Sequence, residues 1–288
     1  MSDTRSRGSA PTVLRMVLGK RLRQLRERAG VSFEEAARAI DVTPLTIRRM
    51  EKASVGLRIP YVRELLHTYG VEEREIEDFL ALAREANRPG WWYQYRDVLP
   101  EWFKAYVSLE SEATLIRAYE PHYMPGLLQT RDYARTILRL GFPNESPEEI
   151  ERRVELRVRR QELLDKPNAP TVWAILDETV LLRPVGGAKV MRHQIERVID
   201  AISNDKVRIQ IMRFSAGPHP GAFGPFHYFR FGFSELPDIV YTESLTGSAY
   251  VDQRVDVEAY LEVLDRMSVQ AAPVEQTRAI LEEARKEF

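Results

Sequence analysis

The chain has 288 residues and a formal net charge of −1; 44% of its residues are hydrophobic, 30% are charged and none is cysteine. This length allows two domains with hydrophobic cores, and the lack of cysteine excludes disulfides, thiolate zinc sites and thiol redox chemistry, as is common in the reducing cytoplasm. The charge is unevenly distributed: residues 1–60 hold 13 of the 42 Lys and Arg but only 6 of the 43 Asp and Glu. Their net charge is therefore +7, against −8 for the remainder of the chain. This asymmetry favours contact with a polyanion at one end of the chain.

The N-terminal residues 1–12 are polar and aperiodic, so we expect a flexible arm; they lack the apolar core of a secretory signal. No segment approaches about 18 uninterrupted apolar residues, so no membrane span is expected. Leucines at helical spacing, a stop at Gly30 and the capping-box pair Ser32 and Glu35 begin a run of short helices. The five helices of this all-α module are expected within residues 13–30, 32–40, 43–53, 59–71 and 72–87.

The third predicted helix, residues 43–53, has its positive charge on one side. Pro44 suits the first helical position, and Thr43 is expected to cap the helix by accepting from a backbone N–H of the first turn. On a helical wheel one side, centred near Ile47, can pack inward; it holds Thr43, Ile47, Met50, Glu51 and Ser54. The opposite side holds Leu45, Arg48, Arg49 and Lys52. A solvated basic face would show the same pattern, but two short helices joined by a tight polar connection are typical of a helix-turn-helix, whose second helix enters the major groove.

Residues 18–70, through "SFEEAARAIDVTPLTIRRMEKA", resemble the Xre/Cro/phage-repressor type of helix-turn-helix. The resemblance implies double-stranded DNA as the partner and a buried structural ion pair between Arg26 and Glu51. It implies contacts to base edges by Thr43, Leu45, Thr46 and Arg49, and contacts to phosphates by Arg48, Lys52, Arg58 and Ser32. Three features depart from the family: Phe33 replaces a phosphate-binding Gln, Asp41 replaces a turn glycine, and Pro44-Leu45 stands where polar base readers are usual.

A turn signal and a dense group of aromatic residues after residue 87 place the domain boundary at residue 88. Residues 88–166 are expected to be mainly helical, and residues 167–288 to be α+β, because β-branched and aromatic runs separated by Gly, Pro and Asp then appear. Helices are expected within 108–120, 127–140, 146–165, 188–203, 255–272 and 273–288, and strands within 171–182, 207–214, 225–233, 238–245 and 247–253. The predicted fold class is therefore α+β, with an N-terminal all-α domain and a C-terminal domain of helices and a mainly antiparallel sheet.

Residues 88–285 resemble the C-terminal regulatory domain of actinobacterial Xre-type regulators, the group that includes WhiJ-like developmental regulators. The resemblance is seen in "GWWYQYRDVLPEWFKAYVSLESEA", "YEPHYMPGLLQTRDYARTIL", "LDETVLLRPVGG" and "GAFGPFHYFRF…DIVYTES". It implies a transcription regulator, often encoded beside a small partner protein, and some members are antitoxin-like. It does not identify the signal.

Five residues of this second domain are candidates for a ligand or partner pocket. Trp91 and Trp92 suit either an apolar pocket or a helix-joining core, and the core is the commoner outcome. Glu178, His219 and Glu243 suit a polar pocket or acid/base chemistry, against the plainer interpretation as strand-end residues with internal hydrogen bonds. Their spacing matches no metal motif, and the chain has no phosphate-cradling loop or nucleophile elbow, so no metal, cofactor or enzyme activity is expected.

The sequence therefore predicts a cytoplasmic, sequence-specific DNA-binding transcriptional regulator. One short helix reads few base pairs, so we expect a homodimer on a palindromic operator, with the C-terminal domain responsible for dimerisation and for input from a small-molecule effector or a small protein. The alternative is an antitoxin-like interaction protein that binds a small partner and regulates its own operon. An enzyme fused to a DNA-binding domain is the third possibility, and it would need Glu178 to act in catalysis.

Overall fold

The computed structural model describes residues 12–88, 90–233, 236–244 and 247–288, so the arm expected at residues 1–12 lies outside the described residues except for Thr12. The described chain forms two compact units. The first unit comprises the residues up to Gln94 together with Pro100–Glu112, Phe233 and Leu236, and the second comprises Tyr95–Leu99, Ala113–Gly232 and Pro237–Phe288. The predicted domain boundary at residue 88 stays a prediction, because the chain crosses between the units more than once.

The first unit contains the five predicted helices. They are α1 (Val13–Arg28), α2 (Phe33–Ala39), α3 (Pro44–Glu51), α4 (Ile59–Thr68) and α5 (Glu73–Ala86). Their inward side chains, including Leu22, Ile47, Leu65 and Phe79, form one buried core. The predicted capping box at the start of α2 is present, with Ser32 accepting from the Glu35 N–H. A further helix, α6 (Glu101–Glu112), joins this unit, and Ser108 there accepts from the Val13 N–H at 2.9 Å.

The second unit is built on a mixed six-stranded sheet. Its strands are β1 (Ala113–Glu120), β2 (Thr171–Asp177), β3 (Val207–Met212), β4 (Phe226–Phe231), β5 (Ile239–Ser244) and β6 (Gly247–Val251). They lie in the order β3-β2-β1-β4-β5-β6. The pairs β3-β2 and β2-β1 are parallel, and the pairs β1-β4, β4-β5 and β5-β6 are antiparallel. The α+β class with a mainly antiparallel sheet is thereby confirmed.

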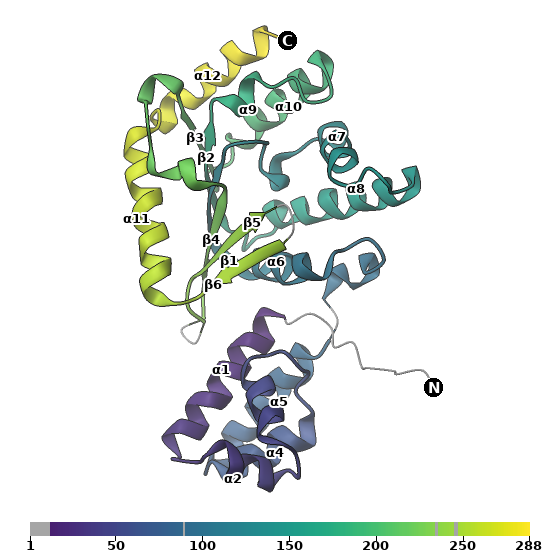
Figure 1. The fold of residues 1–288 in the computed structure, drawn as a ribbon, viewed down its shortest axis with the longest axis vertical. Helices are drawn as coiled ribbons and strands as arrows, with labels where there is room; N and C mark the ends of the chain where they lie inside the picture. The colour runs from purple at the N-terminus through teal and green to yellow at the C-terminus, as the bar shows by residue number, and fades with distance from the viewer. Residues whose placement is uncertain (1–11, 89, 234–235, 245–246) are drawn as a thin grey trace. The chain divides into compact units, whose positions relative to one another are not determined.

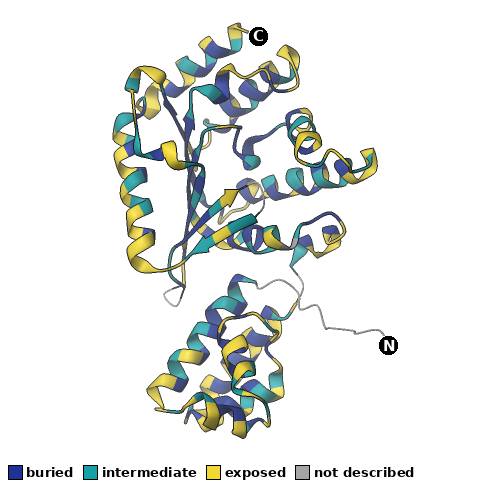
Figure 2. Cartoon of the chain, viewed as in Figure 1, coloured by how far each residue is buried: buried dark blue, intermediate teal, exposed yellow. Residues whose placement is uncertain are grey.

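Helices cover both faces of this sheet. They are α7 (Arg131–Gly141), α8 (Pro147–Gln161), α9 (Thr179–Leu182), α10 (Ala188–Ala201), α11 (Arg254–Gln270) and α12 (Val274–Lys286). Figure 1 shows α11 along one face, with α7 and α8 on the other. The buried stripe of α11, which includes Val257, Leu264 and Met267, packs on the strands, while its outward stripe is exposed (Figure 2).

Two elements differ from the sequence-based expectation. The strand expected within residues 171–182 ends at Asp177, and Thr179–Leu182 form the short helix α9 instead. A helix was expected within residues 108–120, but α6 ends at Glu112 and β1 runs from Ala113 to Glu120 at the centre of the sheet. Both faces of β1 are covered, so residues from Ile116 to Tyr119 are all buried and no apolar-polar alternation marks the strand. A short strand that is buried on both faces cannot be distinguished from a buried helix by periodicity alone.

Candidate nucleic-acid interface

Helix α3 has a buried back and an exposed front. Ile47 and Met50 are 0% and 1% exposed and belong to the core of the first unit. On the front, Thr43, Leu45, Arg48, Arg49 and Lys52 are all exposed; we call these five residues the reading face. Leu45 is 54% exposed, a high value for an apolar side chain on a short packed helix. The predicted wheel matches the observed burial for Ile47, Met50 and Glu51, but Thr43 and Ser54, which it placed on the same inward side, are exposed.

The connection between α2 and α3 is tight and bends through a left-handed residue. Asp41 has φ 52°, which a glycine adopts without strain and which Asp tolerates better than most residues. Pro44 begins the helix as predicted, but the prediction for the Thr43 side chain was wrong: it makes no capping hydrogen bond. Its hydroxyl lies instead 3.2 Å from the Thr46 hydroxyl, so the two threonines form a polar pair at the exposed N-terminus of α3.

Arg26 of α1 and Glu51 at the end of α3 form a two-pronged ion pair. Arg26 Nε donates to Glu51 Oε1 at 2.6 Å and Nη2 donates to Oε2 at 3.1 Å, with the two side chains only 7% and 3% exposed. Arg26 also donates to the Val31 carbonyl at 3.0 Å. The hydrogen bond to Glu51 raises the pKa of Arg26, and burial raises the pKa of the adjacent Tyr69. This bridge ties the C-terminal end of α3 to α1, which fixes the orientation of the reading face.

The cationic side chains of the interface differ in the contacts that they make with other residues. Neither Arg49 nor Lys52 forms an ion pair with another described residue, so both charges are available to a ligand. Arg58 lies 5.6 Å from the centroid of the Tyr61 ring. Ser32 is less available, because its hydroxyl donates to Glu35 Oε2 at 2.7 Å, and a phosphate at Ser32 would have to compete with that carboxylate. The sequence missed the contact that holds Arg48, which is made by an aromatic ring of α2.

The five residues expected to line a pocket belong to both units, with Trp91 and Trp92 in the first and the other three in the second. Trp91 and Trp92 pack within the first unit: their rings meet edge to face, 6.1 Å apart, and Trp91 Nε1 donates to Ser111 Oγ at 3.2 Å. Trp92 is only 9% exposed, which agrees with the alternative interpretation of these aromatic residues as core.

In the second unit, Glu178 and His219 have internal partners. Glu178 pairs with Arg213 at 2.8 Å and accepts from the Phe214 N–H at 2.6 Å. His219 Nε2 lies 3.5 Å from the Tyr119 hydroxyl and 3.8 Å from Asp177 Oδ2. Tyr119 and Asp177 were not among the predicted site residues, because their approach to His219 depends on the pairing of β1 with β2.

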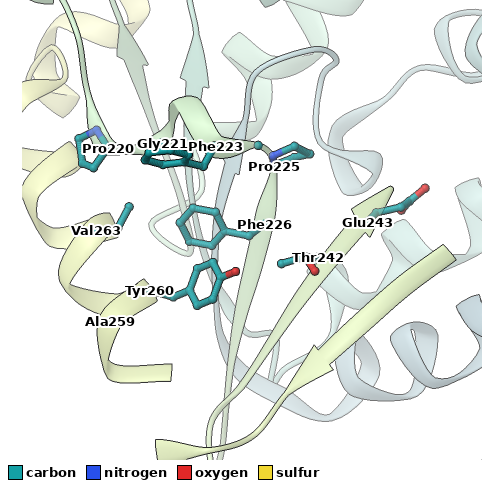
Figure 3. Close-up of a pocket in the computed structure, with 11 residues that line it drawn as sticks. Pro220, Gly221, Phe223, Pro225, Phe226, Thr242, Glu243, Ala259, Tyr260 and Val263 are labelled. Carbon is teal, nitrogen blue, oxygen red and sulfur yellow. The ribbon is translucent and has the colours of Figure 1, made fainter. Parts of the chain in front are cut away.

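A cavity of about 480 Å³ lies between β4, β5, α11 and the loop before β4. The rings of Phe226 and Tyr260, 4.9 Å apart, form its floor. Glu243 is one of its lining residues, while Glu178 and His219 are not. Figure 3 shows the Glu243 carboxylate pointing away from the two rings, and its Oε2 accepts from the Tyr241 hydroxyl at 2.8 Å. The polar pocket expected from these three residues stays a prediction.

Two further observations concern the described residues as a whole. None of their His, Asp and Glu side chains gather in a group of three or more that could hold a metal ion. No helix among them combines the length and apolar character needed to cross a membrane.

Comparison with known proteins agrees with this two-part organisation. Residues 17–79 match a helix-turn-helix domain, and residues 103–283 match a domain of unknown function, DUF5753. No curated protein matches the chain. The crystal structure of the clp gene regulator ClgR from C. glutamicum is similar at 26% identity over 27% of this chain and 96% of that chain, with a TM-score of 0.22.

The helix-turn-helix match covers most of α1 and all of α2, α3 and α4, and it confirms the resemblance to helix-turn-helix transcriptional regulators. It indicates a DNA-binding role for the first unit. The second match extends over more than half of the chain. The chain therefore belongs to the family of proteins that contain the domain of unknown function DUF5753.

Proposed function

We propose that this protein is a sequence-specific transcriptional regulator that inserts α3 into the major groove of double-stranded DNA. The observation that supports this most directly is the reading face of α3, which has an apolar residue, a threonine and three cations exposed over a fully buried back. A helix that is packed on one side and cationic on the other can lie between two rows of phosphates with its N-terminal residues at base edges.

The residues of the interface then divide into two groups. Thr43, Leu45, Thr46 and Arg49 face base edges, and Arg is well suited to this because its planar fork matches the two acceptors of guanine. Arg48, Lys52 and Arg58 contact phosphates, which supply affinity without sequence preference. Ser32 makes at most a secondary phosphate contact while its hydroxyl remains bonded to Glu35.

The chain acts as a homodimer on a palindromic operator in this proposal, since one reading helix contacts too few base pairs for useful specificity. Half-sites would be about 34–36 Å apart, or a multiple of that distance. The second unit would supply dimerisation and receive a signal from a small molecule or a small protein, and the protein would act in the cytoplasm without a catalytic function.

Arg49 and Lys52, two of the reading-face cations without an ion pair, should have different effects when removed. Arg49→Ala should weaken binding to the preferred operator by about tenfold but leave binding to random duplex nearly unchanged. Lys52→Ala should weaken binding to all duplexes and lower the slope of log K against log salt by about one. Selection from a random duplex library first identifies the operator. Titrations of the full chain with operator and with random duplex at several salt concentrations then give the affinities and the salt slope.

Equal losses on operator and random duplex in Arg49→Ala would remove Arg49 from the base-reading group. If the unaltered chain selects no sequence from the library, the proposed function itself is wrong. Glu34→Gln is a matched control, because this exposed charge on α2 lies outside the proposed contacts.

The exposed Leu45 should recognise a thymine methyl group, since a branched apolar side chain offers no hydrogen bond to a base edge. Replacing thymidine by deoxyuridine removes only that methyl group. At one operator position we expect the replacement to weaken binding of the unaltered chain by about threefold, and to have no effect on Leu45→Ala. The same loss in both proteins would mean that another residue contacts the methyl group.

A further inference from the structure

Phe33, the first residue of α2, lies against two arginines that come from different helices. The guanidinium carbon of Arg26 is 4.0 Å from the centroid of the Phe33 ring, and that of Arg48 is 4.7 Å from it. Phe33 is partly buried and packs against the core of the first unit. One ring thus connects the buried Arg26–Glu51 pair to an exposed cation of the reading face.

The two arginines are not equally fixed. Arg26 is held by Glu51 and by the Val31 carbonyl, so its position does not depend on the ring. Arg48 is exposed and forms no ion pair with any other residue of the described chain. A long cationic side chain on a helix surface loses considerable rotamer entropy when it is held in one geometry. The Phe33 ring is the contact that restricts Arg48 before any ligand arrives.

We propose that Phe33 is a positioning residue that holds Arg48 in the orientation needed to contact a phosphate of bound DNA. The proposal rests on the proposed function. Phe33 has no side-chain donor of its own, so it acts through Arg48 by attraction between the cation and the face of the ring. Restricting Arg48 in advance lowers the entropy that is lost on binding, and this raises affinity without adding a contact to DNA.

The size of the effect follows from the exposure of Arg48. Cation–π contacts at exposed sites change an equilibrium about two- to fivefold. A phosphate contact is independent of sequence, so operator and random duplex should be affected alike. This separates the role of Phe33 from that of Arg49, whose loss should change the preference between sequences.

The test is a double-mutant cycle on the full chain, with binding to the operator and to random duplex measured at several salt concentrations. Phe33→Leu keeps an apolar side chain but removes the ring, and should weaken both complexes about two- to fivefold. In an Arg48→Ala background the same change should have no effect, because the side chain that the ring orients is gone. Phe33→Tyr keeps an aromatic face and should bind like the unaltered chain.

Two results would overturn the proposal: full affinity in Phe33→Leu, or an equal loss with and without Arg48, which would show a structural role only. Stepwise fluorination of the Phe33 ring addresses the case in which Phe33→Leu fails to fold, because it weakens the π face with little change of volume. Affinity should fall with each added fluorine, and a constant affinity across the series would contradict the proposal. Failure of the unaltered chain to bind any duplex would instead reject the proposed function.

Discussion

Replacing Glu51 by leucine should lower the stability of the first unit by about 3–5 kcal/mol, because Arg26 would be left as a buried charge without its partner. Arg26 loses two hydrogen bonds in this variant, and its side chain is only 7% exposed. The remaining nearby carboxylate, Glu27, is 3.7 Å from Arg26 and itself half exposed, so it replaces little of the lost interaction. Hydrogen exchange of the α1 and α3 amides in the full chain measures the change locally, without assuming that the two units unfold together.

The matched control is the double variant Arg26→Met with Glu51→Leu. It removes both charges and fills the site with apolar atoms, so most of the protection should return; replacing a buried ion pair in this way is often neutral or stabilising. That recovery would show that the pair contributes more to orienting α3 than to net stability. If the single variant Glu51→Leu keeps the exchange rates of the unaltered chain, the ion pair does not hold α3 against α1.

Replacing Gly19 by alanine should separate α1 from the end of α3. A Cβ at this position would lie 2.7 Å from the Glu51 carbonyl oxygen and 2.9 Å from that of Met50, both of which are backbone atoms of α3. Alanine favours a helix over glycine by about 1 kcal/mol, but overpacking a close backbone contact costs about 1–3 kcal/mol. The backbone of α3 cannot rotate away as a side chain can, so we expect the clash to prevail, with a net loss of up to about 2 kcal/mol.

The displacement should also weaken DNA binding, because the carbonyls involved belong to the helix that bears the reading face. Thermal unfolding and operator titration of the full chain measure the two effects. Gly141→Ala is the matched control: a methyl group added to this helical glycine of α7 would have nothing within 4 Å of it, so the change should be neutral or slightly stabilising. Equal behaviour of the two variants would show that α1 and α3 can separate without cost.

Much of the reading helix could be predicted from the sequence, because its determinants are local. The inward side of α3, the proline at its start and the capping box of α2 depend on residues within a few positions of one another. Apolar residues that repeat with the 3.6-residue period of an α-helix identify its buried side without information from the rest of the chain. The Thr43 cap was wrong even so, since its hydroxyl has an equally close local partner in Thr46.

Only the tertiary structure decided the features that join distant segments. The strand β1 between two others, the closeness of Phe33 to Arg48, the backbone contact at Gly19 and the approach of His219 to Asp177 all depend on how separate elements pack. None of these contacts produces a periodic pattern in the sequence, because each is made by one or two residues on each side. The sequence by itself determined which side of α3 is exposed, since hydrophobic burial acts on every turn of a helix; packing between helices determined how that side is held and oriented.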